Sequence, residues 1–170
     1  MNVAVTAEDV KRLREETGAG VMDAKRALDE AGGNFAQAKE ILREKGVAAA
    51  AKRSERETSQ GIVEAYIHGQ GRIGALVDLR CETDFVARTD TFKALAKDVA
   101  MQVAAMSPLA LNPEDVPADA PGEAKDNALL TQTFIKDGSK TVGDLIKAAI
   151  AQTGENIRIA KFARFELGRD

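Results

Sequence analysis

The sequence predicts an α+β fold, in which a three-helix module is followed by a three-stranded antiparallel sheet packed with helices. In the first part of the chain, apolar residues recur at helical spacing and are separated by glycines. From residue 61 the spacing changes to the two-residue alternation of strands, and helical spacing later returns. We expect a helical module at 1–46, a helical linker at 47–60 and an α+β core domain at 61–170.

Glycines and capping residues divide the first module into three helices. Thr6-Ala7-Glu8-Asp9 has the spacing of a capping box and starts the first helix, which closes at Thr17-Gly18-Ala19-Gly20. Gly32-Gly33 ends the second helix, and Asn34 caps a third helix that we expect to stop at Gly46.

A module of this size has a small core and a proportionately large surface, so we expect an exposed apolar patch. Val21 and Met22 are the candidate pair, because flexible methionine suits contact surfaces. The alternative, in which both side chains pack inside the module, stays open.

The core domain begins with a β-hairpin. Val63, Ala65 and Ile67 alternate with polar residues, as do the apolar residues from Ile73 to Cys81, and we expect both rows to face the core. Gly69-Gln70-Gly71 is the expected turn. Cys81, the single cysteine, is expected to be a small buried strand residue, because burial is the commonest fate of free cysteine.

Later segments complete the core domain. A helix from Phe92 to Met106 should cover the hairpin and end at Ser107-Pro108, since proline cannot continue a helix. The proline-rich, acidic residues 107–127 predict a surface crossing. A capping box at Thr141-Val142-Gly143-Asp144 opens another helix. A final strand follows, for which the expected inward residues are Ile157, Ile159, Ala163, Phe165 and Leu167.

Composition makes several functional classes poor candidates. The 24 Lys and Arg against 27 Asp and Glu give a net charge of −3, whereas nucleic-acid binders usually gather a basic excess on one face. The sequence contains neither a signal-like segment nor a long apolar run, so we expect a cytoplasmic protein without membrane contact. With one histidine and one cysteine, we expect no enzyme, cofactor or metal site, although a carboxylate-based site stays open.

The segment from Glu82 to Arg88 lies where an apolar strand gives way to a helix. Thr83 or Asp84 can cap a turn there, which places Phe85 at a corner held by the elements on both sides. Two interpretations follow. The residues alone favour a Phe85 that fills the seam between sheet and helix. The alternative is a rigid aromatic contact for a partner, because aromatics bring large apolar area with few rotamers.

Thr83-Asp84-Phe85-Val86 also resembles the signature of the elongation factor Ts family. Residues 13–28 look like the N-terminal signature of that family, and 154–157 and 164–168 are similar to further family motifs. The resemblance therefore covers nearly the whole chain. It implies a ubiquitin-associated-like helical module ahead of an α+β dimerisation core.

The resemblance implies guanine-nucleotide exchange on the GTPase elongation factor Tu during translation elongation. Asp84 and Phe85 would approach the GTPase near its nucleotide and magnesium site, where the ring would enter an apolar pocket. The implied partner-binding residues are Thr83, Asp84, Phe85, Val86, His68, Gly154, Glu155, Asn156, Val21 and Met22.

The chain departs from the family in two ways. The segment between Pro113 and Thr141 is shorter, so contacts made by that segment do not carry over. Longer members have two related core halves and this chain has one, so we expect a homodimer. From another functional class, the alternative is a ubiquitin-associated-type adaptor that binds a protein partner without exchange activity.

Overall fold

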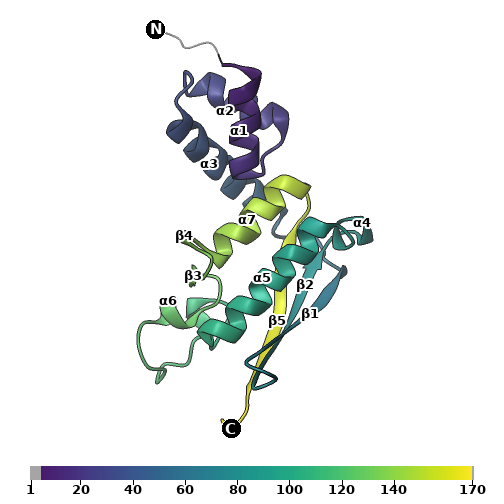
Figure 1. Ribbon diagram of the computed structural model, residues 1–170, viewed down its shortest axis with the longest axis vertical. Helices are drawn as coiled ribbons and strands as arrows, with labels where there is room; N and C mark the ends of the chain where they lie inside the picture. Colours follow the sequence, from purple (N-terminus) through teal and green to yellow (C-terminus); the bar gives the residue numbers. More distant parts are fainter. Residues whose placement is uncertain (1–4, 170) are drawn as a thin grey trace. The chain divides into compact units, whose positions relative to one another are not determined.

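The computed structural model describes residues 5–169, which form two compact units (Figure 1). The first contains the described residues up to Glu55 together with Lys147–Gly154, and the second contains Arg56–Ile146 and the chain from Glu155 onward. The fold is α+β, as predicted. Residues 1–4 of the predicted helical module and residue 170 of the predicted core domain lie outside the described part, and the predicted domain boundaries stay predictions.

The first unit contains α1 (Ala7–Thr17), α2 (Val21–Glu30) and α3 (Phe35–Arg53). The predicted caps of α1 are confirmed: the Thr6 hydroxyl accepts from the Asp9 backbone N–H at 3.1 Å, and Gly18 closes the helix with a φ of 70°. Asn34 caps α3 as expected. The small core of this unit consists of Val10, Leu13, Ala24, Ala27, Leu28 and Ala38.

The prediction that Gly46 ends the third helix is wrong, because α3 continues to Arg53. Gly46 is buried, and a Cβ at this position would lie 3.6 Å from that of Ala151. A glycine inside a helix costs only about 1 kcal/mol relative to alanine. The four alanines at 48–51 have the highest helix propensity and offset that cost.

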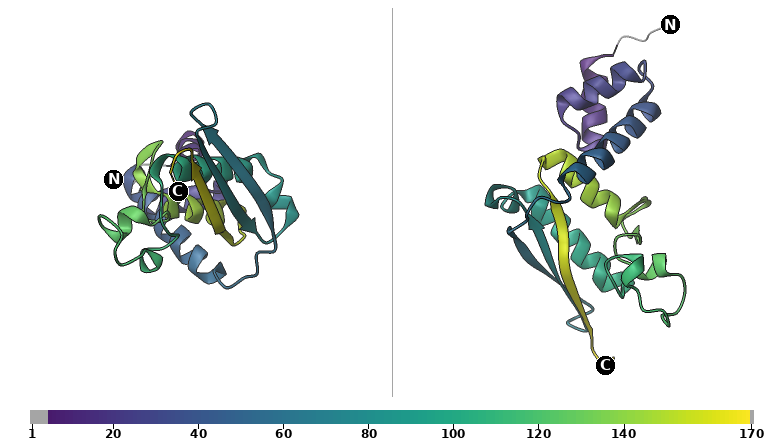
Figure 2. Two further views of the ribbon diagram at one scale, coloured as in Figure 1. Left: turned by 90° about the horizontal axis from the view of Figure 1, so that it is seen from below. Right: turned by 180° about the vertical axis from the view of Figure 1, so that it is seen from behind.

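The second unit is built on an antiparallel sheet in the order β1 (Gln60–His68), β2 (Ile73–Cys81), β5 (Ile157–Glu166). Helix α5 (Asp90–Met106) covers one face of this sheet, as the sequence predicts (Figures 1 and 2). The buried residues between the two layers include Ala75, Val77, Leu79, Cys81, Phe92, Ala96, Val99 and Val103.

The predicted inward face of β1 is wrong. The hairpin loop has four residues, Gly69 to Arg72, because His68 pairs with Ile73. The expected three-residue turn would have placed Ile67 opposite Ile73, on the same face. One extra loop residue reverses that relation, since successive strand residues point to opposite faces. Val63 and Ile67 therefore lie on the outer face and are 68% and 65% exposed.

The inward row predicted for β5 is correct at Ile157 and Ile159, which are buried, and wrong farther along. Leu79 pairs with Ile159 but Asp78 pairs with Lys161, so β5 carries one extra residue at Ala160. Such a bulge exchanges the two faces of the strand. Phe165 consequently lies on the outer face and is 67% exposed.

The short helix α4 (Asp84–Ala87) lies between β2 and α5. The remaining elements connect α5 to the last strand and are η1 (Pro113–Asp115), α6 (Ala124–Asn127), β3 (Thr133–Phe134), β4 (Asp137–Thr141) and α7 (Val142–Thr153). The predicted capping box between Thr141 and Asp144 is present. The β3–β4 pair was not predicted. It is anchored by the buried Gln102 side chain, which donates to the Thr133 carbonyl at 3.1 Å and accepts from the Ile135 N–H at 3.0 Å.

Within residues 5–169, no helix is both long enough and apolar enough to cross a bilayer.

Cys81 gives a direct test of this core, because its side chain is fully buried at the end of β2. Burial, with a smaller contribution from the nearby Glu155 carboxylate, raises the pKa of the Cys81 thiol from 9.0 to about 11. At about pH 8, we expect the native thiol to react with a disulfide reagent at least about a hundredfold more slowly than the urea-unfolded chain, because less thiolate is present. The measurement is the rate of thiolate release from the reagent; equal rates in the two states would contradict the burial of Cys81.

Candidate functional site

The strand-to-helix junction after β2 presents an exposed aromatic ring. Thr83 is the N-cap of α4, and its hydroxyl accepts from the Val86 N–H at 3.4 Å. Phe85, in the first turn of α4, is 81% exposed. The interpretation in which Phe85 fills the seam is therefore wrong. Ala87 and Cys81, which are 6% and 0% exposed, are the buried residues nearest to it in sequence.

A carboxylate lies beside the ring. Asp84 is half-buried and forms an ion pair with Arg88, with 3.0 Å between Oδ2 and a guanidinium nitrogen. The Arg88 side chain is largely exposed, and such pairs contribute about 0–1 kcal/mol. A partner can therefore replace this contact at little cost. The corner thus presents an apolar surface next to a negative charge.

Glu155 lies two residues before the start of β5 and accepts hydrogen bonds from Glu82 and Thr83, which precede the exposed ring. Its Oε2 accepts from the backbone N–H groups of Glu82 and Thr83 at 3.1 and 3.0 Å. Its Oε1 accepts from the Thr83 hydroxyl at 2.5 Å. Two segments more than 70 residues apart in the sequence are therefore joined by one side chain.

The junction is closed from the opposite direction as well. Glu82 Oε1 accepts from the Asn156 backbone N–H at 2.6 Å. The Asn156 side chain is buried and donates to the Arg56 carbonyl at 2.8 Å, which satisfies an amide that would be costly to bury alone. Sequence reasoning missed Glu82 and Arg56, because no local pattern shows which distant residue will pair with either one.

His68 does not belong to this corner. Gln60, at the other end of β1, pairs with Cys81, so His68 lies eight residues farther along the strand. At about 3.3 Å per residue, this separation is roughly 26 Å. His68 is exposed next to the hairpin loop, and its ring stacks on Tyr66 with 6.1 Å between centroids.

Val21 and Met22, the predicted residues of the helical module, are exposed. They open α2 and are 55% and 62% exposed, so the alternative in which both pack inside is wrong. Gly154 follows α7 with a φ of 75°, a left-handed conformation that glycine adopts readily.

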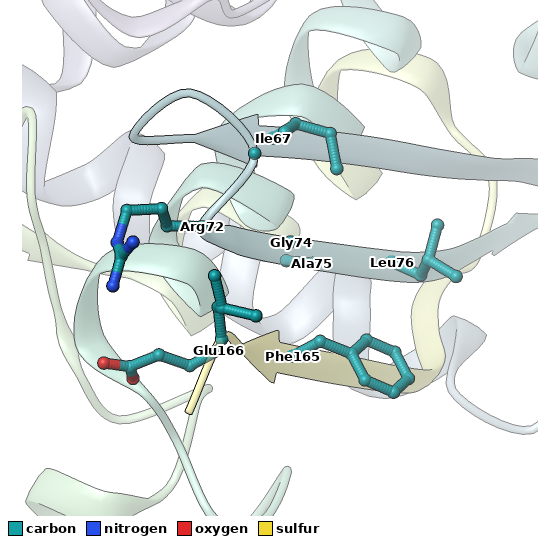
Figure 3. Close-up of a pocket in the computed structure, with 9 residues that line it drawn as sticks. Ile67, Arg72, Gly74, Ala75, Leu76, Phe165 and Glu166 are labelled. Atoms are coloured by element: carbon teal, nitrogen blue, oxygen red, sulfur yellow. The ribbon is translucent and has the colours of Figure 1, made fainter. Parts of the chain in front are cut away.

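A second surface lies on the outer face of the sheet at its hairpin end. Figure 3 shows Ile67, Leu76 and Phe165 on the three neighbouring strands β1, β2 and β5, around a pocket. Leu167, which also lines this pocket, is 66% exposed. Exposed apolar surface of this extent is typical of an interaction site.

The part of the chain that the structure describes contains no candidate metal-binding cluster. Between residues 5 and 169, no group of three or more His, Cys, Asp or Glu side chains converges as metal ligands. The arrangement at the corner is suited to binding through the ring and the carboxylate.

Comparison with known proteins adds independent evidence. The family profile described as Elongation factor TS matches residues 6–126. An elongation factor Ts of Desulfosudis oleivorans is 45% identical over 194 residues, covering 96% of this chain and 98% of the relative. One of Leptospira biflexa is 46% identical over 196 residues, covering 98% and 99%, and one of Carboxydothermus hydrogenoformans is 50% identical over 194 residues, covering 96% and 89%.

These alignments are longer than the 170 residues of the chain, so the relatives carry residues that this chain lacks. The alignments nevertheless cover nearly the full length of this chain and of the Desulfosudis and Leptospira relatives. With the profile match and these relatives, the chain belongs to the elongation factor Ts family, a family of translation elongation factors.

Proposed function

We propose that this protein is a cytoplasmic guanine-nucleotide exchange factor for elongation factor Tu, and that it promotes GDP release by inserting Phe85 near the nucleotide and magnesium site. The observation that carries the proposal is the 81% exposure of Phe85 on a corner anchored from both sides. An exposed phenyl ring on an anchored backbone can bring a large apolar area to a partner with few rotamers to fix.

Linkage gives the energetic reason. A factor that binds the nucleotide-free GTPase more tightly than the GDP-bound form must weaken GDP binding by the same factor. Burial of one aromatic side chain only in the open state supplies about 2–4 kcal/mol, which corresponds to about thirtyfold to a thousandfold in affinity.

Asp84 supports the same interpretation. Magnesium prefers oxygen ligands in near-ideal octahedral geometry, so a carboxylate that arrives with the ring would perturb an existing magnesium site. The pairing of Asp84 with the exposed Arg88 leaves the carboxylate accessible for such a contact.

Val21 and Met22 form a second proposed contact with the GTPase, in the helical module. Their exposure of 55% and 62% makes them available to a partner. Two contacts on one chain raise the overall affinity, because the second binding event becomes intramolecular. His68 is a further proposed contact at the hairpin end of the core.

We also propose that the protein acts as a homodimer through the outer sheet face. An antiparallel sheet with one solvated face normally alternates apolar-in with polar-out, whereas Ile67, Leu76 and Phe165 point outward here. A second copy is the proposed occupant, because the face carries both charge signs, in the Asp78–Arg80 ion pair and at Lys161, and can complement itself about a two-fold axis.

The substitution Phe85→Ala should fold normally, since the ring is exposed, and should lose most exchange activity, by about thirtyfold or more. The measurement is the release of a fluorescent GDP analogue from elongation factor Tu. Leu109→Ala, an exposed apolar residue outside the corner, is the matched control and should keep full activity. Unchanged release with Phe85→Ala would refute the insertion, and a wild-type protein that binds the GTPase without accelerating release would favour the adaptor alternative.

For the homodimer, sedimentation velocity at micromolar concentration should show a dimer for the wild type and a monomer for Phe165→Lys. A lysine at this position would bring two like charges into an apolar interface, while the isolated fold should tolerate it because Phe165 is 67% exposed. Leu109→Lys, at an exposed position outside the strands, should stay dimeric. A wild type that sediments only as a monomer would rule out the dimer.

A further inference from the structure

We infer that Glu155 is a positioning residue for exchange, and that it acts by holding the Glu82-Thr83 backbone so that Phe85 is presented in one fixed orientation. This inference rests on the proposed function of Phe85. It gives Glu155 a role different from the partner contact that the family resemblance implies.

The first support is the use of the carboxylate. Both oxygens accept hydrogen bonds from the same two residues: Oε2 from the N–H groups of Glu82 and Thr83, and Oε1 from the Thr83 hydroxyl. Hydrogen bonds to a charged acceptor are roughly twice as strong as neutral ones. The acceptor capacity of Glu155 is thus directed into the protein, toward the residues that precede Phe85.

The second support is the connection to the ring. The Thr83 hydroxyl donates to Glu155 and also accepts from the Val86 N–H in the first turn of α4. Because the hydroxyl proton is engaged by Glu155, the oxygen lone pairs remain directed toward α4. The orientation of the capping group, and with it the first turn that carries Phe85, therefore depends on Glu155.

The third support is the length of α4. A helix of four residues cannot maintain itself, because isolated helices shorter than about 12 residues are marginal in water. Its geometry must come from anchors at its ends. At the N-terminal end these anchors are Thr83 and the carboxylate of Glu155.

The Asn156 N–H that donates to Glu82 makes the closure reciprocal. Each segment supplies a carboxylate to the backbone of the other: Glu155 to residues 82 and 83, and Glu82 to residue 156. A backbone held in this way loses little conformational entropy when a partner binds the ring. Glu155 thereby contributes to exchange without touching the GTPase.

The substitution Glu155→Gln isolates this role, because it keeps the shape and replaces one acceptor oxygen with a donor. Either the two backbone N–H groups or the Thr83 hydroxyl then loses its acceptor. We expect exchange activity to fall by roughly ten- to a hundredfold, the range that a displacement of about 1 Å can cost. Glu114→Gln, which removes one negative charge at an exposed position of the same unit, should leave activity unchanged.

The decisive experiment is a double-mutant cycle with Phe85→Ala, measured as release of the fluorescent GDP analogue. If Glu155 acts through the ring, Glu155→Gln should have no further effect in the Phe85→Ala background. If Glu155 contacts the GTPase itself, the two losses should multiply, and that result would overturn the inference. Unchanged activity of Glu155→Gln in the otherwise wild-type protein would also overturn it.

A second readout separates the inference from the proposed function. Amide hydrogen exchange of the free protein should speed up at Glu82, Thr83 and Val86 in Glu155→Gln, while Val77 and Leu79 in the buried strand keep their protection. This measurement requires no GTPase, so it tests the anchoring even if Phe85→Ala proves fully active. Unaltered exchange at residues 82–86 would show that Glu155 does not position the corner.

Discussion

The corner that carries Phe85 depends on the reciprocal hydrogen bonds between residues 82–83 and 155–156. β2 ends at Cys81 and α5 begins only at Asp90, so the four-residue helix between them has little structure of its own to hold the ring. Carboxylates from both segments satisfy backbone N–H groups that are otherwise left over where strand and helix end. Presentation of the ring is therefore coupled to the folded sheet.

Features set by neighbouring residues could be predicted from the sequence. The caps at Thr6, Asn34 and Thr141 are hydrogen bonds between residues three apart, so their whole geometry is contained in a short motif. The left-handed Gly18 is equally local. Gly46 shows the limit of such reasoning, because a single unfavourable residue does not end a helix whose following residues favour it.

The faces of the sheet could not be predicted, and both errors have the same physical cause. Side chains alternate with a period of two, so one extra residue in the loop at Gly69 to Arg72 reverses the face of β1 relative to β2, and one at Ala160 reverses the later positions of β5. Hydrophobic alternation gives the period but not which face is buried. Together the loop and the bulge place Ile67 and Phe165 on the same outer face, which neither strand pattern alone indicates.

The two exposed apolar features suit different kinds of contact. Phe85 is a single ring on an anchored corner, a shape that enters a pocket, whereas the outer sheet face is broad and suits a flat, lasting interface. They also lie far apart. Gly74, at the centre of the apolar patch, is seven residues along β2 from Cys81, which is roughly 23 Å. A second copy seated on the hairpin end of the sheet would therefore leave Phe85 free for the GTPase.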